Sequence, residues 1–98
     1  MWRHGDVLIA AISELPANAR LRLDGVLARG EQTGHMHRIA VPESAELWEL
    51  DGELFMRVIT EKARIVHEEH QPIELPRGVY RVWQQREYTP EKIRRITD

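Results

Sequence analysis

Four of the five histidines in this chain fall into two short groups, and these are the residues whose type and spacing could carry chemistry. The first group is His35-Met36-His37 and the second is His67-Glu68-Glu69-His70. Side chains two residues apart on a strand share a face and lie roughly 6 to 7 Å apart, which suits two imidazoles on one metal ion. A third ligand would come from the second group. The pattern therefore predicts a metal site formed by His35, His37, His67 and His70.

The ligand types restrict which metal such a site would hold. The chain has no cysteine, so a disulfide framework, a Cys-ligated zinc site and thiol catalysis are excluded, and only nitrogen and oxygen ligands remain. This favours a borderline divalent metal: Zn, Fe, Mn or Ni, with the identity left open. Pro72 disfavours helical geometry at the preceding residue, so we expect the second group to leave a strand near Glu68. We expect His67 as the third ligand, with His70 next and Glu69 as a possible oxygen ligand. His4 stands alone in the sequence and is expected to be structural or terminal rather than a ligand.

Length and composition limit the protein class. The chain has 98 residues, which predicts one small domain over residues 1–98. A net charge of -2, with 31% charged residues, gives no overall argument for nucleic acid or for a membrane. No apolar run approaches the roughly 18 residues that span a bilayer, and the N-terminus lacks a secretory layout. We therefore expect a cytoplasmic protein.

Two Asp-Gly pairs predict hairpins in the first two thirds of the chain. Val7–Ile12 is a short apolar run, typical of a strand that is buried on both faces. Asp24-Gly25 predicts a hairpin between Arg20–Leu23 and Val26–Ala28. Asp51-Gly52 predicts a second hairpin, between Glu46–Leu50 and Glu53–Ile59. Its register places Trp48 opposite Phe55 and Glu46 opposite Arg57, two favourable cross-strand pairs.

The remaining segments complete an all-β pattern. Ala63–Glu68 is expected to be a strand, Pro72–Leu75 a short extended piece, and Pro76–Gly78 a turn before the strand Val79–Tyr88. Thr89 can cap a helix with proline at its first position, which predicts a short C-terminal helix over Pro90–Thr97. Seven or eight short strands indicate an all-β fold, a small antiparallel barrel or sandwich.

The glycine and histidine pattern resembles the cupin family over roughly residues 30 to 83. Gly30 to His37 resembles the first cupin motif, in which glycine precedes His-x-His on a barrel strand, and Pro76-Arg77-Gly78 resembles the Pro-x-Gly turn of the second motif. The resemblance implies a cupin-like barrel with metal ligands at His35 and His37. The chain departs from the family where Val41 and Pro42 stand at the glutamate positions and Arg81 at that of the last histidine, so the full ligand set does not carry over.

Three functions are consistent with this pattern. A metal-dependent enzyme, a hydrolase or one that transforms a small molecule, would use Glu68 or Glu69 as base, with Arg81 near an anionic substrate. A metal-independent ribonuclease would use two histidines as acid and base, with Arg77, Arg81 or Arg86 at the phosphate of RNA. A non-enzymatic interaction module would leave the histidines as a polar surface. Open strand edges also favour a homodimer.

Overall fold

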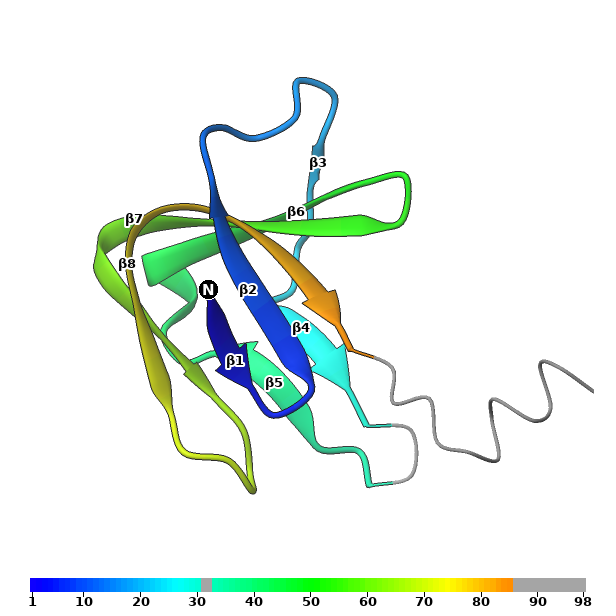
Figure 1. The fold of residues 1–98 in the computed structure, drawn as a ribbon, viewed down its shortest axis with the longest axis vertical. Coiled ribbons are helices and arrows are strands. Elements are labelled where there is room, and N and C mark those ends of the chain that lie inside the picture. The colour runs from blue at the N-terminus through cyan, green and yellow to red at the C-terminus, as the bar shows by residue number, and fades with distance from the viewer. Residues whose placement is uncertain (31–32, 86–98) are drawn as a thin grey trace, which may run out of the picture.

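The protein is described by a computed structural model over residues 1–30 and 33–85, and all its strands belong to one antiparallel sheet (Figure 1). This confirms the all-β prediction. The strands are β1 Trp2–His4, β2 Val7–Ile12, β3 Arg20–Leu21, β4 Val26–Arg29, β5 Met36–Ile39, β6 Ala45–Leu50, β7 Glu53–Val66 and β8 Ile73–Gln84, with a 3-10 turn, η1, at Pro42–Ser44.

The long strands β7 and β8 form the middle of the sheet. The strand order is β1-β2-β8-β7-β5-β4, and β6 joins β7 and carries β3. The first part of β7 pairs with β6 and its end pairs with β5, with a register shift against β8 between Val58 and Lys62. One edge of β7 thus carries two short arms of the sheet: β6 with β3 on its first part, and β5 with β4 on its end. Within the described residues neither arm pairs with β1, so the sheet is open and the closed-barrel prediction is wrong.

The hydrophobic core is formed by buried apolar side chains from most of these strands. On β2, Val7 and Ile9 are fully buried, and Leu8 on the opposite face is also buried, as expected for the start of this strand. The largest fully buried apolar side chains come from four strands and are Ile9, Leu47, Met56, Ile65 and Leu75. Among residues 1–30 and 33–85 there is no helix of the length and apolar character needed to cross a membrane.

The hairpin at Asp51-Gly52 is confirmed, register included. Trp48 pairs with Phe55 and Glu46 with Arg57. Both turn residues have positive φ, 51° for Asp51 and 80° for Gly52, as a type I′ turn requires.

The hairpin predicted at Asp24-Gly25 is wrong, because its two strands pair with different partners. β3 pairs with β6, and β4 pairs with β5. The Asp24 carboxylate accepts hydrogen bonds from the Arg22 guanidinium at 2.8 Å and the Val26 amide at 3.2 Å. The Gly25 carbonyl accepts one from the Ile39 amide at 2.9 Å. These local bonds make the segment a connection between two arms of the sheet.

Two predicted interruptions between strands are absent, because β7 and β8 each run through the place where a break was expected. The expected strand Ala63–Glu68 is the second part of β7 and ends at Val66, and the expected turn Pro76–Gly78 lies inside β8. Pro76 is tolerated there because it pairs with Lys62 at the register shift, where the ladder is already irregular. The end of the predicted strand Val79–Tyr88 and the predicted helix Pro90–Thr97 lie outside the described residues.

We expect Gly52→Val to lower the free energy of unfolding by about 1 to 2 kcal/mol, because a β-branched residue resists positive φ. Nothing lies within 4 Å of the position a Cβ would take at Gly52, so the cost would come from the backbone. Urea unfolding measures it. Asp51→Asn, which tolerates positive φ, should leave stability nearly unchanged; equal stability of the two variants would contradict the turn assignment.

Candidate metal centre

The first part of the site is a tight turn that joins β1 to β2. Its two loop residues are Gly5 and Asp6, because His4 pairs directly with Val7. Gly5 has φ of 63°, and glycine with positive φ at the first loop position is typical of a type II′ hairpin. The turn places the His4 and Asp6 side chains at one end of the sheet.

The second part is His37 on β5. Burial alternates along this strand: His37 and Ile39 are buried and Arg38 is exposed. The His37 imidazole therefore lies on the core side of the sheet, with 4% of the residue exposed. A buried histidine in a small domain requires polar partners, and all of them come from other segments.

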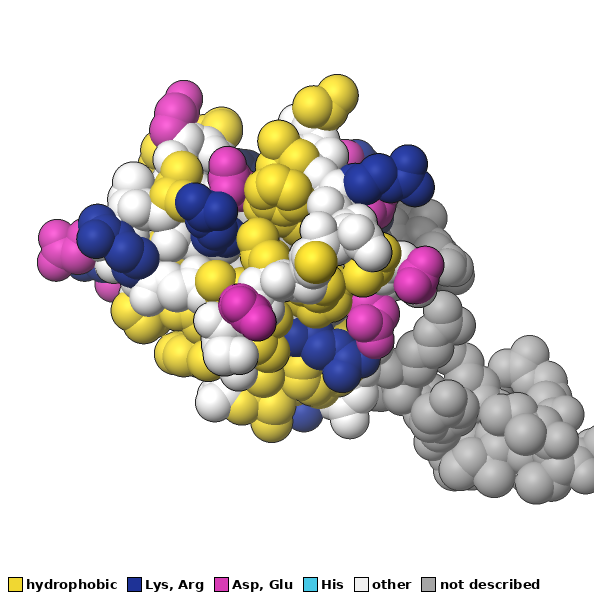
Figure 2. Space-filling model, turned by 90° about the horizontal axis from the view of Figure 1, so that it is seen from above, with side chains coloured by type: hydrophobic (Ala, Val, Ile, Leu, Met, Phe, Trp, Pro, Cys, Tyr) yellow, Lys and Arg dark blue, Asp and Glu magenta, His cyan; other side chains and the backbone are white. Residues whose placement is uncertain are grey.

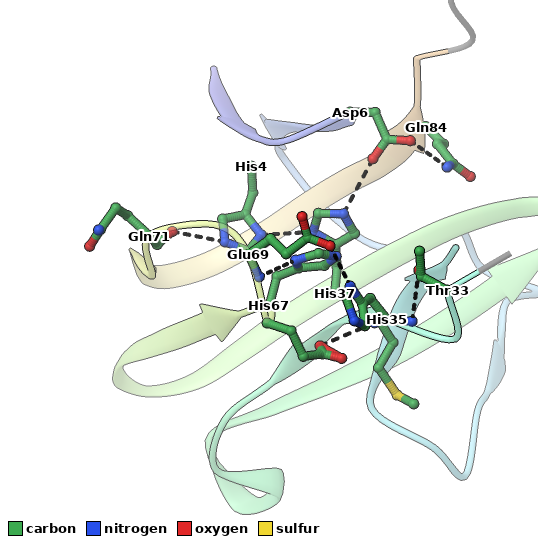
Figure 3. A network of polar contacts seen from close by, with 11 residues as sticks. His4, Asp6, Thr33, His35, His37, His67, Glu69, Gln71 and Gln84 are labelled. Carbon is green, nitrogen blue, oxygen red and sulfur yellow. Dashed lines mark hydrogen bonds and ion pairs between the residues drawn. The ribbon is translucent and has the colours of Figure 1, made fainter. Parts of the chain in front are cut away.

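The third part is the connection between β7 and β8, which carries His67 and His70. The chain bends over residues 68–70, and Figure 3 shows the His67 ring beside that of His37. Ring centroids of His37 and His67 are 4.3 Å apart, and those of His67 and His70 4.6 Å. One nitrogen from each of the three rings lies within 4.8 Å of the others, so His37, His67 and His70 could hold a metal ion.

Asp6 adds a carboxylate to this group. Its Oδ1 is 3.2 Å from His37 Nε2. The side chain is oriented by the end of β8, where Gln84 Nε2 donates to Oδ2, while the Gln85 amide donates to the Asp6 carbonyl at 2.7 Å. Asp6 lines the same pocket as the three clustered histidines.

A chain of hydrogen bonds fixes the protons on the two buried histidines. His4 Nε2 is 2.9 Å from the Gln71 carbonyl, which only accepts, so His4 carries its proton at Nε2. A neutral His4 then has a lone pair at Nδ1, 2.9 Å from His37 Nδ1, which must donate. A neutral His37 therefore presents a lone pair at Nε2, directly toward the Asp6 carboxylate.

The contacts His4–Gln71, His4–His37 and His37–Asp6 each need a hydrogen or a cation between their two atoms. Two neutral imidazole rings supply only two N–H groups, so one contact is left without. With neutral rings, His37 Nε2 and Asp6 Oδ1 are two acceptors that face each other, which is unfavourable. A proton on His37 would relieve this. Burial, and then the neighbouring His67 and His4, lower the pKa of His37 to about 4 in spite of Asp6, and burial also lowers the pKa of His4. The contact therefore lacks a cation whenever His4 and His37 are both neutral.

His67 has a different partner. The Glu69 amide donates to His67 Nδ1 at 2.9 Å, so a neutral His67 carries its proton at Nε2. A metal at Nδ1 would displace this bond directly. A metal at Nε2 would move the proton to Nδ1, where it would face the amide. Metal binding at His67 through either nitrogen therefore breaks the Glu69 hydrogen bond.

The other residues that the sequence singled out lie beside the cluster or away from it. His35 Nδ1 is 2.6 Å from Glu69 Oε1, and the His35 ring is 5.7 Å from that of His67, so His35 lies at the rim. The Met36 amide donates to Glu68 Oε1 at 3.3 Å, which lowers the pKa of that carboxyl. Arg81 is paired with Glu53 at 3.0 Å and lines a second pocket that contains none of the histidines.

Sequence reasoning missed Asp6 and the contact of His4 with His37. His4, expected to be structural or terminal, is 2% exposed and lies 2.9 Å from His37, Nδ1 to Nδ1. One signal could have shown that His4 ends a strand: Gly5-Asp6 directly before the apolar run at Val7 has the composition of a two-residue hairpin loop. Its contact with β5 has no local signal, because it depends on the way the whole sheet curves.

Gly5 shapes the site by having no side chain. A Cβ at Gly5 would lie 2.6 Å from His70 Nε2 and 3.0 Å from His37 Cε1. Such distances are too short for real contacts, so the two rings pack directly against the backbone of the turn. Gly34 has a similar φ of 75° but nothing within 4 Å of its Cβ position.

The fold and the site define a small antiparallel β-sheet domain with a partly buried histidine cluster at one end. Residues 3–85 match the model of a family described as Domain of unknown function (DUF8820), and the chain belongs to this family. The matched segment contains every residue of the cluster. No curated protein and no solved structure matches the chain.

The pKa of His37 predicts how the stability of the metal-free protein depends on pH. A pKa lowered from 6.5 to about 4 means that the unfolded chain binds this proton more readily. The resulting stability is present above about pH 6.5 and is lost as pH falls towards 4, by about 3 kcal/mol from His37 alone. Urea unfolding with chelator present at several pH values measures this loss. His37→Gln should flatten the curve, and a wild-type curve that rises on acidification would contradict the assignment.

Proposed function

We propose that the protein binds a divalent metal ion through His37, His67, His70 and Asp6. The observation that carries this proposal is the group of three imidazoles in one pocket, with Asp6 Oδ1 3.2 Å from His37 Nε2. A divalent cation between them would supply the missing charge. The ligand set of neutral imidazoles and one carboxylate suits Zn, Fe, Mn or Ni.

The donor spacing supports the same conclusion. Two ligand atoms bound at about 2.1 Å to one tetrahedral or octahedral ion lie roughly 3.0 to 3.4 Å apart. The 3.2 Å between His37 Nε2 and Asp6 Oδ1 falls in this range. Ligand nitrogens of His37, His67 and His70 lie within 4.8 Å of one another, and this set does not include Asp6, so the four proposed ligands reach one ion only after side-chain rotations. His67 is half-buried and His70 is exposed.

The surroundings of His37 are those of a metal ligand. Metal-bound histidines commonly donate their other ring N–H to a fixed acceptor, which sets the tautomer and orients the ring. His37 donates at Nδ1 to His4, and His4 donates in turn to the Gln71 carbonyl. This chain leaves His37 Nε2 free of a proton, the state that a metal requires.

We further propose that the bound metal serves small-molecule chemistry, with hydrolysis as the first reaction to test. A divalent metal would supply Lewis acidity at the open side of the pocket. We propose Glu69 as the carboxylate that accepts a proton. In sequence it lies between His67 and His70, and its Oε1 is 2.6 Å from His35 Nδ1. The cupin resemblance and the homodimer stay predictions, and the metal proposal depends on neither.

Metal-independent acid-base catalysis, as in the ribonuclease hypothesis, has less support. Both nitrogens of His4 are engaged in hydrogen bonds, and His37, with a pKa of about 4, is a poor proton donor near neutral pH. Cleavage of RNA that survives complete removal of metal would favour that alternative over ours.

We expect the untagged wild-type protein to bind one equivalent of Zn²⁺ in calorimetric titration. His37→Ala, His67→Ala and His70→Ala should each weaken binding by about 100-fold or more, because each removes a ligand. His35→Ala is the matched control: it removes the same side chain from the rim and should change affinity less than about tenfold. A wild-type protein that binds no Zn²⁺, or a His37→Ala variant that binds as well as wild type, would refute the proposal.

A spectroscopic readout accompanies this titration. Because metal binding breaks the Glu69 N–H bond to His67, the amide resonance of Glu69 should move on saturation in a ¹⁵N spectrum, and chelation should restore it. The Leu50 amide, on the distant hairpin, is an internal reference.

Gly5→Ala should weaken Zn²⁺ binding by about tenfold or more, because the new methyl group would push His70 and His37 apart. Gly34→Ala carries a similar backbone cost without this contact and should bind Zn²⁺ as wild type does. Both affinities are measured by the same titration, with circular dichroism to verify folding. Equal affinity of the two variants would show that Gly5 does not shape the site.

A further inference from the structure

We propose that the metal pocket accepts a small phosphorylated ligand, whose phosphoryl group is held by the metal together with Arg3 and Arg29. This inference rests on the proposed metal site and names the ligand class for it. Its basis is the composition of one pocket, which is lined by both arginines and by Asp6, His37, His67 and His70.

The charge of this pocket favours a dianion. Asp6 is the single acidic residue that lines it among the residues the structure describes. A divalent ion would more than neutralise that carboxylate, and the two guanidinium groups would add further positive charge. Arg3 and Arg29 form no ion pair within residues 1–30 and 33–85. Arginine binds phosphoryl oxygens with paired N–H donors, so two arginines beside a metal suit a phosphoryl group better than a neutral or cationic ligand.

The size and remaining lining of the pocket suit a ligand larger than phosphate alone. Its volume is about 420 Å³, within the range of small-molecule sites. Gln84 and Gln85 line it as well and offer amide donors and acceptors. Arg3 lies on β1 and Arg29 on β4, the two ends of the main strand order, so the pocket lies between these two strands.

The test uses protein loaded with Co²⁺, whose visible spectrum responds to a change of ligand. Inorganic phosphate is the probe, and acetate and chloride at the same ionic strength are the comparison anions. We expect phosphate to change the spectrum saturably and more tightly than acetate. Arg3→Gln and Arg29→Gln should each weaken phosphate binding by about tenfold while Co²⁺ affinity stays within about twofold of wild type. Arg38→Gln is the control: it removes the same charge from the exposed face of β5, next to His37 in sequence but outside the pocket.

The outcomes separate the two proposals. If the wild-type protein binds no Co²⁺ or Zn²⁺, the metal site and the phosphoryl site both fail. If metal binds but phosphate leaves the spectrum unchanged, or if all three arginine variants bind phosphate equally, only the phosphoryl proposal fails. Acetate binding as tight as phosphate, with the same dependence on Arg3 and Arg29, would replace the phosphoryl group by a carboxylate and overturn the ligand class.

Discussion

The contact between His4 and His37 is the interaction on which the rest of the site depends. It joins β1 to β5, two strands that are not neighbours in the sheet, and its proton is fixed by the Gln71 carbonyl in a third segment. Because both imidazoles are buried, neither can exchange its partner for water without a cost in free energy. Through His4, one backbone carbonyl thus determines that the neutral His37 ring has no proton on the nitrogen that faces Asp6.

The parts of the molecule that could be predicted from sequence are those set by local chemistry. Asp51-Gly52 between alternating residues determines a turn type and, with it, the pairing of Trp48 with Phe55. The closeness of His67 and His70 also has a local origin, since three residues and a bend ahead of Pro72 suffice to bring the rings together. The same reasoning failed at Asp24-Gly25, where side-chain hydrogen bonds and a link to β5 outweigh the turn preference.

The parts that could not be predicted depend on how distant strands meet. His35 and His37 have the spacing of two ligands on one face, but the Glu69 carboxylate holds His35 at the rim, and β5 begins only at Met36. Asp6 reaches His37 because β2 pairs with β8 and the end of β8 supplies Gln84 and Gln85. No spacing within the sequence encodes that arrangement; it follows from the register of two strands about 75 residues apart.

The separation of the four proposed ligands along the chain bears on folding as well as on chemistry. In an unfolded chain only His67 and His70 would be close, so a metal ion would meet a two-histidine fragment and bind it weakly. The complete site exists only after the first, middle and last strands have assembled. A bound ion would then stabilise the native state selectively, joining chain segments whose association costs the most loop entropy. With a metal bound, the Gly5-Asp6 turn would link β1 and β2 to His37 on β5, and this link would slow the separation of β1 from the rest of the sheet.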